Sequence, residues 1–268
     1  MRRSRLVLFL GTLLLAVTTA LTGATAAQAS QQAANGGYVA LGDSYSSGVG
    51  AGSYISSSGD CKRSTKAYPY LWAAANSPSS FDFTACSGAR TGDVLSGQLG
   101  PLSTATGLVS ISIGGNDAGF ADVMTTCVLQ SDSSCLNRIA TARAYVNSTL
   151  PGRLDSVYSA IRDRAPNADV VVLGYPRFYK LGTFCIGLSE TKRRAINDAA
   201  DLLDNTIAQR AQAHGFTFGD VRTTFSGHEI CSGSSWLHSV DWLNIGNSYH
   251  PKAAGQSGGY LPALDAAA

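Results

Sequence analysis

Two residues far apart in the chain have the chemistry of a nucleophile and a base. Ser44 follows the short apolar run at residues 38–41, within the segment Gly-Asp-Ser-Tyr, and His250 lies near the carboxyl end. A serine hydroxyl attacks a carbonyl carbon when a neighbouring base takes its proton, and histidine is the side chain best suited to that task. Considered alone, Ser44 is explained equally well as a turn residue that caps a helix.

Two further segments supply groups that could stabilise negative charge. The second apolar run of the chain ends shortly before Gly88, and the third ends just before Asn116, in the segment Gly-Gly-Asn-Asp. A backbone N–H and a side-chain amide are neutral donors of the kind that ester hydrolysis needs for its developing oxyanion. If the runs are parallel strands, their carboxyl ends meet at one edge of a sheet. We therefore expect Ser44, Gly88 and Asn116 to converge there, with His250 on the last loop.

The arrangement of apolar runs predicts the scaffold that would position these residues. Five short runs read as buried strands, at residues 38–41, 81–85, 108–113, 169–173 and 216–218. Between them, residues 142–164 and 189–213 have the three-to-four-residue spacing of amphipathic helices, and Pro151 is expected to kink or divide the first. Ser189 is expected to cap the second. Strands that alternate with helices predict an α/β fold, a parallel sheet covered on both faces.

The first 34 residues predict a secretory signal peptide. Three arginines within the first five residues precede an apolar stretch at residues 6–21, and small residues follow. Cleavage after Ala29 or after Ala34 fits this pattern. A retained transmembrane helix is the alternative, which the small-residue exit disfavours. We expect a secreted, extracellular protein with no stable membrane anchor.

Charge and length limit the possible functions of the chain that follows the predicted leader. The leader holds three of the 20 basic residues and none of the 18 acidic ones, so the remaining 234 residues carry a net charge of −1. Because phosphate binding needs clustered positive charge, nucleic acid is excluded as a partner. There is no internal repeat and no Pro-rich linker, which predicts a single domain from residue 35 to 268. We expect it to be a monomer.

The six cysteines predict disulfide bonds. They are Cys61, Cys86, Cys127, Cys135, Cys185 and Cys231. An even number in an exported chain predicts three disulfides, with fifteen pairings possible. Sequential pairing is our prediction, because each pair then closes one local excursion of the chain. There is no C-x-x-C segment, and His228, Glu229 and His238 match no familiar zinc spacing, so we expect no metal and no cofactor.

Four segments, taken together and in order, resemble the GDSL or SGNH family of hydrolases. Ser44, Gly88, Asn116 and His250 match the four residues from which the second name derives. The first family segment normally reads Gly-Asp-Ser-Leu, and Tyr45 takes the place of the leucine here. The resemblance covers nearly all of the chain after the leader. Within the family, the chain resembles most the secreted lipases and esterases of streptomycetes, which share the three-disulfide layout.

This resemblance implies a fold, an activity and the roles of residues. The fold would be a three-layer αβα sandwich around a five-stranded parallel sheet, of the flavodoxin-like kind. Ser44 would be the nucleophile and His250 its base, with oxyanion donors from the N–H groups of Ser44 and Gly88 and from the Asn116 side chain. The activity would be that of an extracellular lipase or esterase acting on lipid esters through an acyl-enzyme. The alternative is a carbohydrate acetyl esterase with the same machinery. A non-catalytic module is disfavoured, because all four reactive positions are filled.

One departure from the family pattern concerns the residue that orients the histidine. The family usually has Asp three residues before His250, where this chain has Asn247. We therefore expect a Ser–His dyad, oriented by the backbone carbonyl of Asn247 or of Ser248. Asp241 is the alternative candidate for this role.

Aromatic residues that follow the strand ends could form the wall of an acyl groove. They are Tyr45, Phe120, Tyr175, Phe178 and Phe184.

Overall fold

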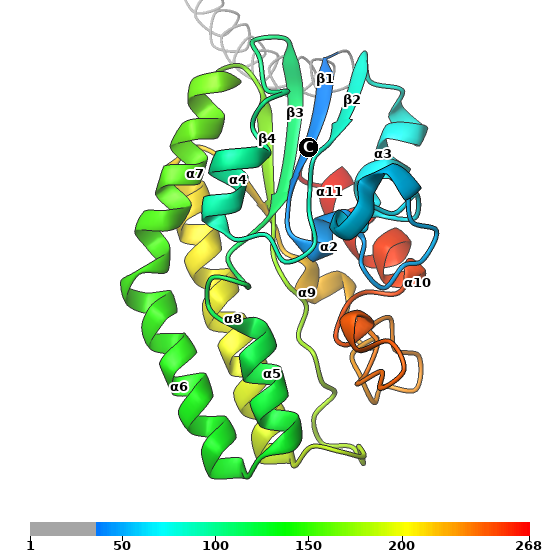
Figure 1. The fold of residues 1–268 in the computed structure, drawn as a ribbon, viewed down its shortest axis with the longest axis vertical. Helices are drawn as coiled ribbons and strands as arrows, with labels where there is room; N and C mark the ends of the chain where they lie inside the picture. The colour runs from blue at the N-terminus through cyan, green and yellow to red at the C-terminus, as the bar shows by residue number, and fades with distance from the viewer. Residues whose placement is uncertain (1–35) are drawn as a thin grey trace, which may run out of the picture.

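A five-stranded sheet forms the centre of the computed structural model, which describes residues 36–268 (Figure 1). Its strands, in spatial order, are β2 (Ser80–Phe83), β1 (Gly37–Gly42), β3 (Thr106–Ser112), β4 (Asp169–Leu173) and β5 (Thr217–Gly219). All four pairings are parallel. The five predicted strands are thus present, and their carboxyl ends lie at one edge. The predicted leader and its cleavage positions lie outside the described residues.

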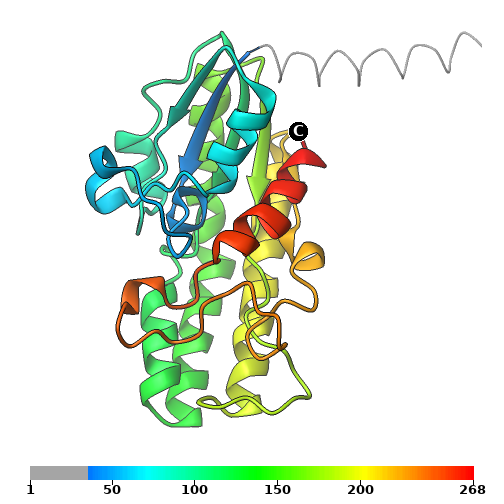
Figure 2. The same ribbon diagram turned by 90° about the vertical axis from the view of Figure 1, so that its right-hand side faces the viewer.

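Helices cover both faces of the sheet, as the alternating pattern predicts. The helices on one face are α4 (Thr91–Gly97), α7 (Leu150–Arg164) and α8 (Glu190–Ala213), and those on the other are α3 (Tyr68–Asn76) and α11 (Leu261–Asp265) (Figures 1 and 2). Every residue of β1 and β3 is buried, because both strands are central and covered on both faces. The fold is therefore the predicted three-layer αβα sandwich.

Three helices continue past the carboxyl edge of the sheet. They are α5 (Phe120–Leu129), α6 (Asp132–Ser148) and the first half of α8 (Figure 1). The helix predicted at residues 142–164 is divided at Thr149, and Pro151 lies in the first turn of α7, where its missing N–H leaves no bond unmade. The Ser189 hydroxyl accepts the N–H of Lys192 and caps α8, as predicted. This extension supplies walls around the carboxyl ends of the strands.

Short helical turns and three disulfides shape the remaining loops. The turns are α2 (Ser44–Ser47), η1 (Ser56–Cys61), α9 (Val221–Thr224), η2 (Ile245–Asn247), α10 (Ala253–Gly255) and η3 (Gln256–Tyr260). The cysteines pair in sequential order, as Cys61–Cys86, Cys127–Cys135 and Cys185–Cys231. Among residues 36–268, none of the helices is both long and apolar enough to span a bilayer.

Candidate active site

The turn after β1 places a serine hydroxyl at the edge of the sheet. Gly42 has a φ of 117°, and a Cβ there would lie 2.4 Å from the Ser112 carbonyl oxygen, so the sharp turn requires glycine. Asp43 then caps α2, because its side chain accepts the N–H of Tyr45 at 3.0 Å. Ser44 is the first residue of α2, with its side chain at the mouth of a cavity.

The structure brings Ser44 and His250 together. The Ser44 Oγ lies 2.8 Å from the His250 Nε2, although the residues are 206 positions apart. Ser44 is 6% exposed and His250 is half-buried. Burial lowers the pKa of His250 to about 4, and the carbonyls of Ser248 and Asn247 counteract part of that decrease. The imidazole is therefore neutral at pH 7, which is the form that can accept a proton from Ser44.

No carboxylate of the described chain bonds to the histidine ring. The His250 Nδ1 is buried without a hydrogen-bond partner among residues 36–268. The Asp241 carboxylate instead accepts the N–H groups of Leu243 and Asn244, at 3.1 and 3.0 Å. The Asn247 carbonyl accepts the backbone N–H of His250 at 3.1 Å. Asp241 thus stabilises the backbone of its own loop. The groups that remain near the ring to orient it are backbone carbonyls.

The loop that carries the histidine is anchored by Tyr45, the residue that replaces the usual leucine. Its hydroxyl donates to the Tyr249 carbonyl at 2.8 Å. Tyr249 has a φ of 67°, and its own hydroxyl bonds to that of Tyr179 at 2.9 Å. The backbone N–H of Tyr249 donates to the His238 carbonyl at 3.0 Å. The backbone next to His250 is therefore held in the left-handed region, which is unfavourable for a bulky residue, by three hydrogen bonds.

His238 packs against the loop that follows Ser44. It is half-buried, and its Nε2 lies 2.9 Å from the Gly50 carbonyl oxygen. His228 stacks on Trp236 with ring centroids 3.6 Å apart. Between residues 36 and 268, no three His, Cys, Asp or Glu side chains form a group that could hold a metal ion.

The candidate oxyanion donors face the same groove as the serine. Gly88 has a φ of 79°, and no described residue accepts its backbone N–H. The Asn116 side chain donates one N–H to the Ala89 carbonyl at 3.0 Å, which fixes the amide and leaves its second N–H. Ser44, Gly88, Asn116 and His250 all line one groove of about 450 Å³. The four residues that the sequence singles out thus converge.

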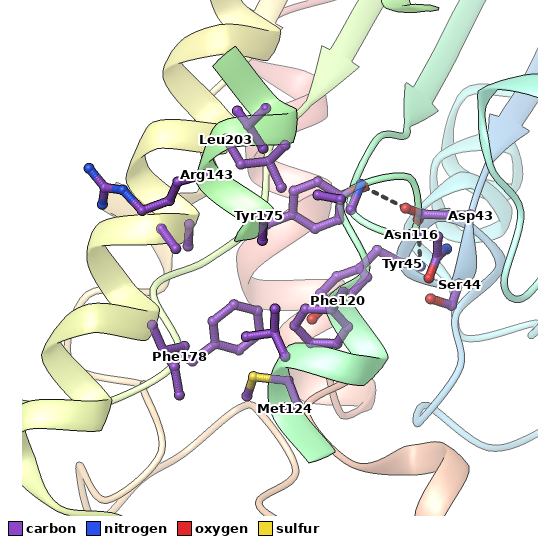
Figure 3. A pocket seen from close by; sticks show the side chains of 18 residues that line it. Asp43, Ser44, Tyr45, Asn116, Phe120, Met124, Arg143, Tyr175, Phe178 and Leu203 are labelled. Carbon is purple, nitrogen blue, oxygen red and sulfur yellow. Dashed lines mark hydrogen bonds between the residues drawn. The ribbon is translucent and has the colours of Figure 1, made fainter. Parts of the chain in front are cut away.

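A buried polar cluster beneath the serine was not predicted. The Tyr175 hydroxyl donates to the Asp43 carboxylate and accepts the N–H of Gly115 at 3.2 Å (Figure 3). The Ser112 hydroxyl donates to the same carboxylate at 2.7 Å. Burial raises the pKa of Asp43 to about 6, against the lowering effect of these hydrogen bonds. Asp43 thus anchors its own turn, and Tyr175 connects that turn to the segment of Asn116.

An apolar cavity of about 70 Å³ opens beside Ser44, between α5, α6 and α8 (Figure 3). Its walls include Tyr45, Phe120, Met124, Val146, Tyr175, Phe178, Ile196, Ala199, Ala200 and Leu203. Four of the five aromatic residues predicted to form an acyl groove are among them. The prediction is wrong for Phe184, which is 86% exposed on the loop that the Cys185–Cys231 disulfide holds. A loop aromatic carries no periodic signal that would fix its direction.

The cavity and the groove meet at the serine. Ser44, Asn116, Phe120 and Met124 line both of them. The cavity lies toward α8, whereas the groove lies between α5 and the loop that precedes His250. A carbonyl carbon bound at Ser44 would therefore have space for a substituent on each side. This arrangement suits an ester, whose acyl and alcohol parts extend in different directions from the carbonyl.

Comparison with known proteins gives the same assignment. Residues 40–257 match the model of the GDSL-like Lipase/Acylhydrolase family. The chain is 82% identical to Lipase 1 of Streptomyces coelicolor over the whole of both chains. Two solved structures, phospholipase A1 from Streptomyces albidoflavus and the extracellular lipase from Streptomyces rimosus, are 69% and 68% identical to it. Each has a TM-score of 0.86, covering 87% of this chain and 100% of its own. The chain thus belongs to the GDSL-like lipase/acylhydrolase family and is a carboxylic-ester hydrolase.

Proposed function

We propose that this protein is an extracellular lipase that hydrolyses carboxylic esters of lipids through an acyl-enzyme on Ser44. The observation that carries the proposal is the 2.8 Å contact between the Ser44 Oγ and the His250 Nε2 where an apolar cavity meets an open groove. Relatives named lipase and phospholipase A1 support acylglycerols and phospholipids as substrates.

The roles of the residues follow from this geometry. As Ser44 attacks the ester carbonyl, its proton passes to the His250 Nε2, and the resulting imidazolium then protonates the departing alcohol. The oxyanion would accept hydrogen bonds from the N–H groups of Ser44 and Gly88 and from the second N–H of Asn116. Water then attacks the acyl-enzyme with the same histidine as base. We assign the orientation of the ring to a backbone carbonyl, that of Ser248 or that of Asn247, both of which favour the charged form of His250.

The lining of the cavity favours lipid esters over acetylated sugars. The acyl side is bounded by Phe120, Met124, Phe178 and the aliphatic residues of α6 and α8, which offer no partners for sugar hydroxyls. Buried hydroxyl groups without partners are costly, whereas an alkyl chain gains free energy on leaving water. The carbohydrate esterase remains the alternative, and substrate comparison decides between the two.

The test compares Ser44→Ala with Ser156→Ala, a matched serine exposed on α7. Both variants and the parent are assayed on p-nitrophenyl esters, triacylglycerol, phosphatidylcholine and acetylated xylan. We expect Ser44→Ala to lose at least about 10³-fold in kcat on every ester and Ser156→Ala to match the parent. Substantial turnover by Ser44→Ala would refute the nucleophile. Preference for acetylated xylan would refute the lipase assignment in favour of the alternative.

We further propose that the mature protein is a secreted monomer with a single domain. The relative from S. rimosus described as extracellular supports secretion. Intact mass of the exported protein should place its first residue at 30 or 35. Sedimentation equilibrium should return the mass of one chain, and calorimetry should give one unfolding transition. A larger mass or two separated transitions would contradict these assignments.

A further inference from the structure

Large apolar side chains are exposed around the mouth of the groove. Leu129, at the end of α5, is 65% exposed, and Trp242, Leu243 and Ile245, on the facing loop, are 68%, 93% and 63% exposed. Leu129, Trp242 and Ile245 also line the groove that contains Ser44. In Figure 2 this loop, in orange, lies beside the green helices α5 and α6. We call these four residues the apolar rim.

We propose that the apolar rim docks on the surface of a lipid aggregate, so that the groove opens directly onto its substrate. The inference rests on the proposed lipase function and adds how the substrate reaches the site. A single exposed apolar residue is common on soluble proteins, but a cluster of them around one opening marks an interaction surface. Trp242 and its aliphatic neighbours suit the boundary between headgroups and acyl chains, where aromatic rings are enriched.

The position of the apolar rim indicates that it binds a lipid surface and not a protein. Three of its four residues line the groove that contains Ser44 and His250. A protein partner or a second copy seated there would close the groove, whereas a lipid surface would fill it with substrate. Moving one long-chain ester through water exposes all of its alkyl surface, and direct transfer from aggregate to groove avoids that exposure.

The loop is also built to enter a poorly hydrated environment. Part of its backbone is paired from within: Asp241 accepts two of its N–H groups, the Asn247 N–H donates to Asn244, and the Ser248 N–H donates to Ile245. Satisfied polar groups reduce the cost of leaving water. These bonds lower the cost of placing the loop against a lipid surface.

Charge contributes little to the proposed contact. None of the four rim side chains is charged, although the Lys62 Nζ lies near the loop, 3.4 Å from where a Cβ on Gly246 would stand. At 1 M ionic strength the Debye length is about 3 Å, so salt screens interactions between exposed charges that are farther apart than this, but it does not weaken apolar burial. Docking on zwitterionic phosphatidylcholine should therefore persist in 1 M NaCl.

The test measures binding without catalysis. In a Ser44→Ala background, the triple variant Trp242→Ser, Leu243→Ser, Ile245→Ser is compared with its parent by co-sedimentation with phosphatidylcholine vesicles. The matched control is Phe184→Ser, Ile186→Ser, which removes two side chains that are 86% and 85% exposed but do not line the groove. We expect the triple variant to bind at least about tenfold more weakly, since full burial of even one such side chain accounts for about an order of magnitude, and the control to bind as the parent does.

Three outcomes would overturn the proposal. They are unchanged binding by a triple variant with native circular dichroism, an equal loss in the control, and a parent that dimerises but does not bind vesicles. With Ser44 restored, the triple variant should lose at least about tenfold more activity on vesicles than on soluble p-nitrophenyl butyrate. Because co-sedimentation needs no turnover, failure of the lipase function would leave the binding result intact and distinguishable.

Discussion

The sharpest prediction concerns the acid that this site lacks. Asp241→Asn removes the carboxylate that could compete for His250, and His250→Ala removes the base. Where a carboxylate orients the histidine of a triad, its loss lowers kcat by about 10⁴-fold. Here Asp241 only accepts the N–H groups of Leu243 and Asn244, and an asparagine oxygen can accept both. We expect Asp241→Asn to change kcat by less than about threefold, a loss of under ~1 kcal/mol, and His250→Ala to lower it by about 10²–10⁴-fold.

The pH dependence of activity tests the same geometry. The base acts when it is neutral, so activity falls as pH decreases through the pKa of His250. Burial lowers that pKa to about 4, whereas a neighbouring carboxylate would raise it above the ordinary value. The acid limb of kcat/KM should therefore lie well below pH 6.5, and activity should persist from neutral to alkaline pH.

The assay is kcat and kcat/KM on a soluble p-nitrophenyl ester between pH 4 and 9, for the parent and both variants. Direct proton titration of His250 by NMR in the Ser44→Ala variant provides an independent value. Losses of similar size in Asp241→Asn and His250→Ala would show that Asp241 completes a triad in solution. An acid limb at or above pH 6.5 would contradict the lowered pKa. The first result would refute the dyad, and the second would refute the effect of burial on the imidazole.

Three further changes test the surroundings of the dyad. Asn116→Ala should lower kcat by about 10²–10³-fold with little change in KM, and a rise in KM with constant kcat would make it a ground-state binding residue instead. Tyr175→Phe removes the hydroxyl that bonds to Asp43 and to the backbone before Asn116; thermal or urea unfolding should show a loss of about 1–3 kcal/mol, with a lower kcat and an unchanged KM. Replacing both Cys61 and Cys86 with Ala should lower the free energy of unfolding by about 2–4 kcal/mol and also reduce activity, because this disulfide holds the segment of Gly88; full activity would contradict that role.

The scaffold was predictable because its signals are local. The apolar run at residues 169–173 coincides with β4, and the serine at position 189 caps α8 as its type suggests. Pro151 was expected to kink or divide a helix. In the structure the helix is divided, into α6 and α7, which lie beside different parts of the fold. The layers follow from the alternation of strands and helices, which predicts a parallel sheet covered on both faces.

The site was predictable only in part, because half of it depends on contacts between distant segments. Ser44 and His250 could be paired from their chemistry and from family resemblance. The contact of Tyr175 with Asp43, 132 residues away, leaves no such signal, since a tyrosine after a strand reads equally as core or as cleft wall. The direction of a loop side chain depends on tertiary packing, which is why Phe184 was predicted in the acyl groove and lies instead on the surface.

The separation of the two reacting groups along the chain has a consequence for folding. Ser44 leaves the ribosome early, whereas His250 follows 206 residues later on a segment held by long-range hydrogen bonds such as that from Tyr45 to Tyr249. Contacts of high sequence separation form late, because closing a long loop costs entropy before any contact repays it. Esterase activity therefore reports completion of the whole fold, and a chain still being synthesised has a nucleophile but no base.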